Sequence, residues 1–556
     1  MEDREVTDIY DVVVLGSGAA GLTAAFTAAH GGAKVAIFEK NDKLGGTTAW
    51  SGGHLWVPNN GLPGSAAGDS EEEAMTYLLS LGRGVLDEHL ARALVHNGRT
   101  MVEFLNEKAE TEFFVTEEFP DYHPSNVGGR PGGGRTIEVA IFPFDELGEW
   151  ADKVTMSPYL PPYLTMSESP LGATVPKPPS EEEIARRAIR QERGSGQGLV
   201  GRLLRANLRE GVDLFLEHRA ASFIVEAGRV IGVTLSTPDG EKRVLARKGV
   251  VLATGGFEWN DELKRTFLRG ALTHPVSIPT NEGDGLIMAM KIGAALQNMR
   301  EAWWSPVAAL PEGMNSMNRM MINADRTRPR SIIVNKKGRR FTNEAASYNA
   351  IGGAFHQEEV TAFEYANLPS WLVFDHEYFR RFGSAGRQLA SLAGEAPPWL
   401  VTADSLPELA DKLGIPGDEL VKTVDRWNEN VRAKYDPDFH RGESAHDLWW
   451  GDPLAKGAIE GTLGEIDTAP YYALRLEIGS LGTKGGPKVD VDARVIDLDG
   501  NPIIGLYAAG NVSSPTGMAY AGAGGTLGPG MTAGYLAGTH VAQLEPALLD
   551  ATLDAI

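Results

Sequence analysis

The stretch DVVVLGSGAAGLTAAFTAAHGGAKVAIFEK, residues 11–40, decides the predicted fold. It opens with a continuous apolar run, the pattern of a buried parallel strand, and then carries G-x-G-x-x-G at Gly16, Gly18 and Gly21. A helix of small residues follows, and a second strand ends at Glu39. This order predicts a βαβ unit that binds a dinucleotide, with the pyrophosphate at the helix N-terminus and Glu39 on the ribose hydroxyl groups.

Three later segments separate FAD from NAD. A Gly/Ser/Thr-rich segment, GGTTAWSGG at 45–53, comes just after Glu39, where it can wrap the phosphates and the ring system of a flavin. Two further strands end in glycine turns, at 253–256 and at 509–511. Three glycine-terminated strands along one chain favour FAD over NAD, and the acidic end of the second strand disfavours the 2′-phosphate of NADP.

The residues expected to contact the cofactor share these segments and the first turn of the C-terminal helix. They are Gly16, Ser17, Gly18, Ala19, Ala20, Gly21, Glu39, Lys40, Gly45, Gly46, Thr47, Thr48, Ser51, Gly52, Gly53, Ala253, Thr254, Gly255, Gly256, Asn281, Asp284, Gly510, Asn511, Gly525, Thr526 and Leu527.

Composition excludes several classes of function. The 556 residues carry a formal net charge of −22, which argues against binding to a nucleic-acid backbone. There is no cysteine, and therefore no disulfide, thiolate metal site or cysteine nucleophile, and no other metal-ligand spacing stands out. The N-terminus has no basic segment followed by an apolar one, and no apolar run has the length of a membrane span. We therefore expect a cytoplasmic protein without a signal peptide.

The pattern predicts an α/β fold, in which a Rossmann-like FAD-binding domain is split in sequence around an α+β catalytic cap. We expect the first part of the FAD-binding domain at 1–281, the cap at 282–477 and the second part at 478–556. Within the cap, SIIVNKKGRRFTNE (331–344) has a hairpin signal at Lys337-Gly338. SLPELADKLG (405–414) and GDELVKTVDRWNENVRAKY (417–435) are predicted helices.

Residues 145–200 interrupt the first part of the FAD-binding domain. SPYLPPYLTMSESPLGATVPKPPS (157–180) is rich in proline, and an Arg-rich helical segment follows it. Two interpretations stay open: a surface excursion plus a helix, or a peripheral membrane contact in which apolar side chains enter the interface and arginines meet anionic lipid.

The order of motifs resembles one family over nearly the whole chain. GSGAAG, GGTTAWSGG, FPDYHP, RRFTNEAASY, HRGE, LGTKGG, GLYAAGN and AYAGAGGTLGPGM are similar to the FAD-dependent 3-ketosteroid Δ1-dehydrogenases, within the succinate dehydrogenase/fumarate reductase flavoprotein group. The resemblance implies that Tyr520 and the backbone N–H of Gly524 hold the C3 carbonyl oxygen of the steroid. It also implies that Tyr348 acts as the base at C2 and that Tyr122 supports that base.

Small departures from the family pattern accompany these motifs. Ala521 and Ala523 stand where family members often carry proline, and His123 stands where a second tyrosine is common. No histidine occurs in GGTTAW, where relatives with covalent flavin carry their attachment site, so non-covalent FAD is expected. His54, His123 and His440 lack metal-ligand spacing and are expected at the surface or in the core.

The implied chemistry is consistent with these residue types. Two donors on a carbonyl oxygen stabilise the developing enolate, as in an oxyanion hole. A phenol with an ordinary pKa of about 10 is a poor base at neutral pH, so Tyr348 needs help, and a hydrogen bond from Tyr122 can supply it. In the implied reaction, bound FAD would accept the C1 hydride at N5, and an external quinone-like acceptor would take the electrons.

Three alternatives remain. A fumarate reductase-like enzyme needs arginine forks for two carboxylates, but no charged residue or histidine occurs from Asn501 to Thr539, which suits a neutral ketone better. A ketosteroid dehydrogenase acting at C4–C5 would use the same cofactor and similar hydrogen bonds to the substrate carbonyl. The third alternative is a non-catalytic flavin or steroid carrier. Such a carrier would not need Tyr122, Tyr348 and Tyr520 as catalytic groups.

Overall fold

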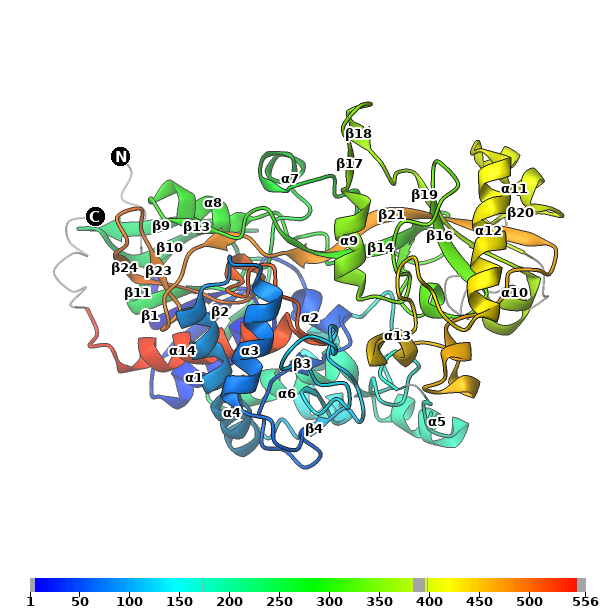
Figure 1. Ribbon diagram of the computed structural model, residues 1–556. Helices are drawn as coiled ribbons and strands as arrows, with labels where there is room; N and C mark the ends of the chain where they lie inside the picture. Colours follow the sequence, from blue (N-terminus) through cyan, green and yellow to red (C-terminus); the bar gives the residue numbers. More distant parts are fainter. Residues whose placement is uncertain (1–5, 174, 384–395, 398, 548–556) are drawn as a thin grey trace.

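The computed structural model describes residues 6–173, 175–383, 396–397 and 399–547 and is organised around two large sheets (Figure 1). The first has eight strands in the order β23-β24-β11-β1-β2-β8, and β10 and β9 continue from β11. Neighbours from β24 to β8 are parallel. The bounds are β1 Val6–Leu15, β2 Val35–Phe38, β8 Asp213–Phe215, β9 Arg219–Glu226, β10 Arg229–Thr237, β11 Gly240–Leu252, β23 Arg494–Ile496 and β24 Pro502–Ala508.

The first sheet is covered on both faces because its central strands are apolar throughout. Val12 and Val14 of β1 pack toward the helices, and Val13 and Leu15 face the other side, toward β10 and α8 (Asp284–Lys291). The helices on the first face are α1 Ala19–His30, α4 Glu88–Lys108, α6 Ser195–Arg209 and α14 Leu527–Gln543. The buried apolar strands are the feature that predicted this parallel arrangement.

The second sheet has seven strands and lies beside the first (Figure 1). Its order is β15-β14-β21-β19-β16, and β12 and β20 both pair with β21. The bounds are β12 His274–Pro275, β14 Ala302–Ala309, β15 Arg319–Met321, β16 Ser331–Asn335, β19 Ser370–Phe374, β20 Val401–Ala403 and β21 Tyr471–Thr483. This sheet therefore extends to both sides of 282–477, and the domain boundaries stay a prediction.

Helices cover both faces of the second sheet. The helices α9 (Tyr348–Phe355) and α10 (His376–Phe382) pack on one face, and α11 (Leu406–Leu413) and α12 (Gly417–Arg432) pack on the other. The last two coincide with the helices predicted from the sequence. The hairpin signal is also present as a turn, since Gly338 has φ +72 and its N–H donates to the carbonyl of Asn335.

Smaller elements complete the chain. They are α2 Gly46–Trp50, β3 Leu55–Trp56, α3 Glu71–Gly82, β4 Phe113–Val115, β5 Thr136–Val139, β6 Phe142–Pro143, α5 Glu181–Ile189, β7 Glu192–Arg193, α7 Asp261–Phe267, β13 Leu296–Gln297, β17 Glu358–Glu359, β18 Glu364–Tyr365, α13 Ala445–Trp449 and β22 Gly486–Pro487. The Arg-rich segment thus forms two helices, α5 and α6, separated by β7. Within the described residues, no helix is both long and apolar enough to cross a membrane.

Candidate active site

Four strand ends meet at one edge of the first sheet. Leu15, Leu252 and Ala508 are in register on the neighbouring strands β1, β11 and β24, and Phe38 of β2 lies beside Leu15. Each strand continues directly into one of the predicted cofactor segments. The carboxyl edge of a parallel sheet is where such folds bind a dinucleotide, so the register brings together segments that are up to 500 residues apart.

The glycines after β1 are required by close backbone contacts. A Cβ on Gly16, which has φ +104, would lie 2.4 Å from the carbonyl oxygen of Ala253, and one on Gly21 would lie 2.1 Å from the carbonyl oxygen of Gly16. Gly18 occupies the N-cap of α1 and has no side chain that could cap the helix. The first turn of α1 therefore presents N–H groups and a positive dipole end to an anion.

The acidic end of β2 is buried against the glycine turn. Oε2 of Glu39 accepts hydrogen bonds from the backbone N–H of Ser17 at 3.1 Å and from its Oγ at 2.6 Å, and Oε1 accepts one from the backbone N–H of Asn41. Lys40 next to it forms an ion pair with Asp284 at 2.8 Å. Glu39 thus lies beside the turn at the start of α1, as the dinucleotide fingerprint requires.

A cavity of about 1050 Å³ begins at this edge and extends toward the second sheet. All predicted cofactor and catalytic residues line it except Gly21, Gly45, Gly256 and Gly525. These four allow close packing instead: a Cβ would meet Ala49 at Gly45, Thr483 and Glu258 at Gly256, and the Tyr520 ring at Gly525. The volume reaches the upper end of the usual range for ligand sites, so it has room for a large cofactor together with a substrate.

Three tyrosine hydroxyls meet in this cavity. The Tyr122 hydroxyl donates to the Tyr348 hydroxyl at 3.1 Å, and the hydroxyls of Tyr348 and Tyr520 are 2.6 Å apart. The three rings contact one another edge to face, with centroids 5.1 to 5.6 Å apart. Each residue comes from a different part of the chain, so only folding brings them together.

Gly524 lines the cavity together with the three tyrosines. No acceptor in the described part of the chain takes its backbone N–H.

Backbone bonds hold the loops of Tyr122 and Tyr520 together. The N–H of Tyr122 and the hydroxyl of Tyr77 both donate to the carbonyl of Ala521, and the same hydroxyl accepts from the N–H of His123. Asp121 is buried beside them and accepts from Trp56 at 2.7 Å. Burial raises the pKa of Asp121 to about 6. No pattern in the sequence indicates this role of Tyr77.

Burial dominates the electrostatics of the three phenols. It raises the pKa of Tyr122 and of Tyr348 well above the usual value, and it raises the pKa of Tyr520 as well. The hydrogen bond with Tyr348 opposes the increase at Tyr520. Removal of a substrate proton by Tyr348 therefore needs a stabilising positive charge or donors beyond Tyr122 alone.

Sequence reasoning missed two buried cations behind these rings. The ammonium of Lys484 lies 4.1 Å from the centroid of the Trp303 ring, which is 4.7 Å from the Tyr520 ring. Burial lowers the pKa of Lys484 to about 7. Arg326 is fully buried near Tyr122 and Tyr348. LGTKGG contained Lys484, but neither cation had a pattern that separates it from a surface charge.

The proline-rich segment has a role that its composition did not suggest. Tyr159, Leu160, Pro161, Leu171 and Val175 line the cavity. The segment therefore forms part of a wall around a ligand.

Several of the arginines that follow the proline-rich segment have acidic partners. Arg187 pairs with Glu168, and Arg202 pairs with Glu112.

The predicted histidines take the expected places. His54 is buried beside Phe119, and burial lowers the pKa of His54 to about 4. Burial also lowers the pKa of His123 to about 4. His440 is exposed and pairs with Glu443.

The site fits FAD by its own chemistry. The start of α1, where Gly18 has no capping side chain, and the glycine turns after the strands line the cavity. Together with the sheet, these features define a dinucleotide-binding flavoprotein. The chain belongs to the FAD binding domain family, which matches residues 11–527.

Individual relatives resemble the chain over nearly its full length. It is 41% identical to a 4-oxocyclohexanecarboxylate 2-dehydrogenase of Sinomonas cyclohexanicum, covering 96% of this chain and 93% of the relative. It is 38% identical to a 3-oxosteroid 1-dehydrogenase of Mycolicibacterium smegmatis, covering 96% and 97%. The crystal structure of 3-ketosteroid delta1-dehydrogenase from Sterolibacterium denitrificans in complex with 1,4-androstadiene-3,17-dione superposes with a TM-score of 0.89 at 33% identity, covering 96% and 100%.

These comparisons bear on several predictions. The α/β flavoprotein fold, the resemblance to the ketosteroid Δ1-dehydrogenases and FAD as the cofactor are confirmed. The chemical roles of the individual site residues stay predictions.

Proposed function

We propose that the chain is a FAD-dependent oxidoreductase that desaturates 3-ketosteroids between C1 and C2. The observation that supports it best is the group of three tyrosine hydroxyls on the wall of a cavity that also holds the cofactor segments. Relatives named 3-oxosteroid 1-dehydrogenase at 38% identity support the same reaction.

In this proposal the carbonyl oxygen of the substrate takes the place next to Tyr520 and Gly524. The Tyr520 hydroxyl and the Gly524 N–H donate to it and stabilise the enolate that forms when the C2 proton leaves. Tyr348 accepts that proton, and Tyr122 donates to the oxygen of Tyr348. Bound FAD would supply the hydride acceptor for C1. An external quinone-like acceptor would then remove the electrons.

A second substrate class is favoured by one specific observation. A relative that is 41% identical is named for 4-oxocyclohexanecarboxylate, a cyclic ketone with a carboxylate opposite its carbonyl group. Arg328 and Arg381 lie at the cavity wall, with their guanidinium carbons 4.5 and 4.9 Å from the centroid of the Phe382 ring. Arg381 already pairs with Asp452, which also lines the cavity, so Arg328 is the cation that suits a carboxylate at the far end of a ketone.

The membrane contact at 145–200 stays a second, separate prediction. Salt bridges to Arg187 and Arg202 leave less free positive charge for anionic lipid than the sequence suggested. Co-sedimentation with anionic liposomes, with and without deletion of 157–180, tests it, and unchanged sedimentation contradicts it.

Anaerobic flavin reduction by two substrates tests the proposed function. The protein purified with FAD should lose its oxidised-flavin absorbance on mixing with androstenedione, and the product should be the 1,4-diene. Preference for 4-oxocyclohexanecarboxylate would select the second substrate class. Double-bond formation at C4–C5 of a 5α-saturated steroid would select the alternative regiochemistry. Reduction of fumarate without turnover of any cyclic ketone would refute the proposal.

A further inference from the structure

Tyr348, the proposed base, lies in an environment that disfavours the phenolate, the form that can accept a proton. Tyr348 is 5% exposed, and its two hydrogen-bond partners are the neutral phenols Tyr122 and Tyr520. A phenolate in such a place loses the solvation of water, and two phenols replace only part of it. A nearby fixed positive charge is the remaining way to keep Tyr348 ionisable near neutral pH.

Arg326 supplies a charge at the right place. It lies in the short 3₁₀ helix Asp325–Thr327, which precedes β16, and its side chain is inaccessible to solvent. Its Nη1 donates to the backbone carbonyls of Glu344 and, at 2.7 Å, Ala346. Both carbonyls belong to the loop that leads into Tyr348, so the guanidinium is fixed to the segment that carries the proposed base.

The charge of Arg326 is not neutralised by an ion pair. No carboxylate among the described residues lies within ion-pair distance of it, and its Nε and Nη2 have no hydrogen-bond partner there. The carboxylate that acts on it electrostatically is Asp447, whose oxygens accept hydrogen bonds from Asn343, Gly442 and Ser444. An unpaired cation in a protein interior costs several kcal/mol, and a functional site is where such a cost is commonly found.

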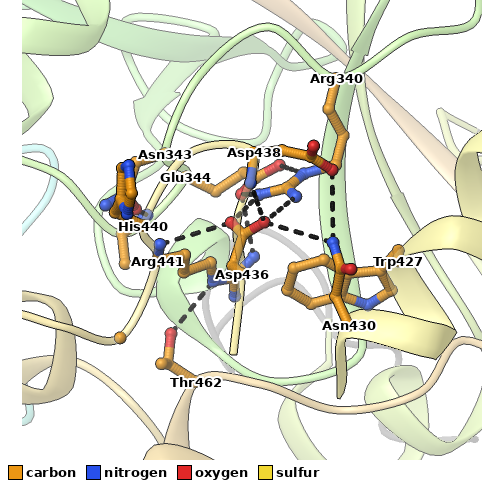
Figure 2. A network of polar contacts seen from close by, with 12 residues as sticks. Arg340, Asn343, Glu344, Trp427, Asn430, Asp436, Asp438, His440, Arg441 and Thr462 are labelled. Carbon is orange, nitrogen blue, oxygen red and sulfur yellow. Dashed lines mark hydrogen bonds and ion pairs between the residues drawn. The ribbon is translucent and has the colours of Figure 1, made fainter. Parts of the chain in front are cut away.

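The neighbouring charged groups do not share this feature. Figure 2 shows Arg340, Glu344, Asp436 and Arg441 close together, in a part of the chain that includes the loop after β16. Arg340 binds both Glu344 and Asp436, and Arg441 binds Glu344 at 3.3 Å. These two cations and two anions balance one another. The balanced network holds the loop of Glu344 in place, and Arg326 remains as the uncompensated charge beside it.

Ionisable groups surround Arg326 on several elements. They are Tyr122, Tyr348, His446, Asp447 and Arg441. Burial lowers the pKa of His446 to about 3 and that of Arg326 to about 9, so at neutral pH the imidazole is neutral and the guanidinium is charged. The positive charge acts on Tyr122 and lowers its pKa relative to burial alone. Of the groups that can take up negative charge there, Tyr348 is the one that the reaction ionises.

We propose that Arg326 is a positioning residue whose guanidinium charge stabilises the phenolate of Tyr348 and sets the pH range in which the C2 proton is removed. This inference rests on the proposed function, because it concerns the same base. Arg326 acts through Tyr348 and through the loop of Ala346, and it does not line the cavity.

The pH profile of anaerobic flavin reduction tests this role. The rate should rise with pH as Tyr348 ionises. In Arg326→Gln the neutral amide leaves the phenolate without its charge, so the rise should move to higher pH by about one unit or more, with roughly tenfold slower reduction at pH 7. Arg326→Lys keeps the charge and should restore most of the wild-type profile. Exchange of the C2 hydrogen with D₂O should slow in parallel, while binding of the dienone product stays unchanged.

A matched control separates charge from stability. Arg202 is another buried arginine bonded to backbone carbonyls, those of Glu110 and Ile141, and its hydrogen bonds and ion pair involve none of the three tyrosines. Arg202→Gln should lower the Tm without moving the pH profile. Arg326→Met is the second neutral variant if Arg326→Gln does not fold. An unshifted profile in a neutral variant overturns the inference, and so does an equal shift in Arg202→Gln. Absence of steroid turnover in the wild type would instead refute the proposed function.

Discussion

Replacement of Gly524 by alanine should remove one donor from the carbonyl site. Gly524 has φ +85, and a Cβ there would lie 2.4 Å from the backbone of His54 and Leu55. Ordinary contact begins at 3.4 Å, so the loop must move by about 1 Å. A donor displaced by that distance no longer reaches the carbonyl oxygen, which should slow flavin reduction by about 10²- to 10³-fold. The left-handed conformation adds a strain of about 1–2 kcal/mol.

Single-turnover reduction by a saturating ketone measures this effect apart from binding. The FAD content should be checked first, because other backbone groups hold the cofactor. Gly32→Ala is the matched control: Gly32 has φ +89, and nothing lies within 4 Å of the added Cβ. The Gly32→Ala enzyme should have the same left-handed backbone strain but reduce its flavin at the wild-type rate. A Gly524→Ala enzyme that reduces its flavin at nearly the wild-type rate would remove the Gly524 N–H from the reaction.

The other predictions use different readouts. Tyr520→Phe should slow flavin reduction by about 10²-fold or more through loss of the second donor, and a near-native rate would exclude Tyr520 from the carbonyl site. Burial lowers the pKa of Lys484 from 10.5 to about 7. Between these two pH values the lysine holds its proton in the unfolded chain but not in the folded protein, so the free energy of unfolding should rise with pH across this interval. Lys484→Met should therefore raise the Tm at low pH, with a gain that fades toward pH 10.5; a pH-independent change would contradict this. Arg328→Met should raise the KM for a carboxylate-bearing ketone but not for a neutral steroid, and equal effects on both would exclude an anion site there.

The cofactor end of the molecule could be predicted because local patterns determine it. The apolar strand before Gly16 needs helices on both of its faces, and the glycine spacing reports contacts within one turn. The late turns at 253–256 and 509–511 were recognisable for the same reason. Their alignment with Gly16 then follows from strand register in one parallel sheet.

Long-range electrostatics could not be predicted in this way. An arginine between Asp325 and Thr327 looks solvated in the sequence, and only the fold shows that two backbone carbonyls hold it inside the protein. The proline-rich segment at 157–180 has no period that would say which side chains face inward. Its composition therefore predicts a surface excursion or a membrane contact, and neither interpretation shows that several of its residues line the cavity.

The positions of the buried cations help to distinguish between a neutral ketone and a dicarboxylate as the substrate. A charge-free stretch at the carbonyl site does not exclude a dicarboxylate by itself, because cations can arrive from other segments, as Lys484 and Arg326 do. Both lie behind the aromatic walls and do not line the cavity, so neither offers a fork to a carboxylate, and the arginines that do line it, Arg328 and Arg381, lie at Phe382 instead. From there a cation can still stabilise negative charge that develops on an enolate or a phenolate, since Coulomb interactions in the interior act over several ångströms. The region around Tyr520 therefore favours a substrate that enters neutral and becomes anionic only during the reaction.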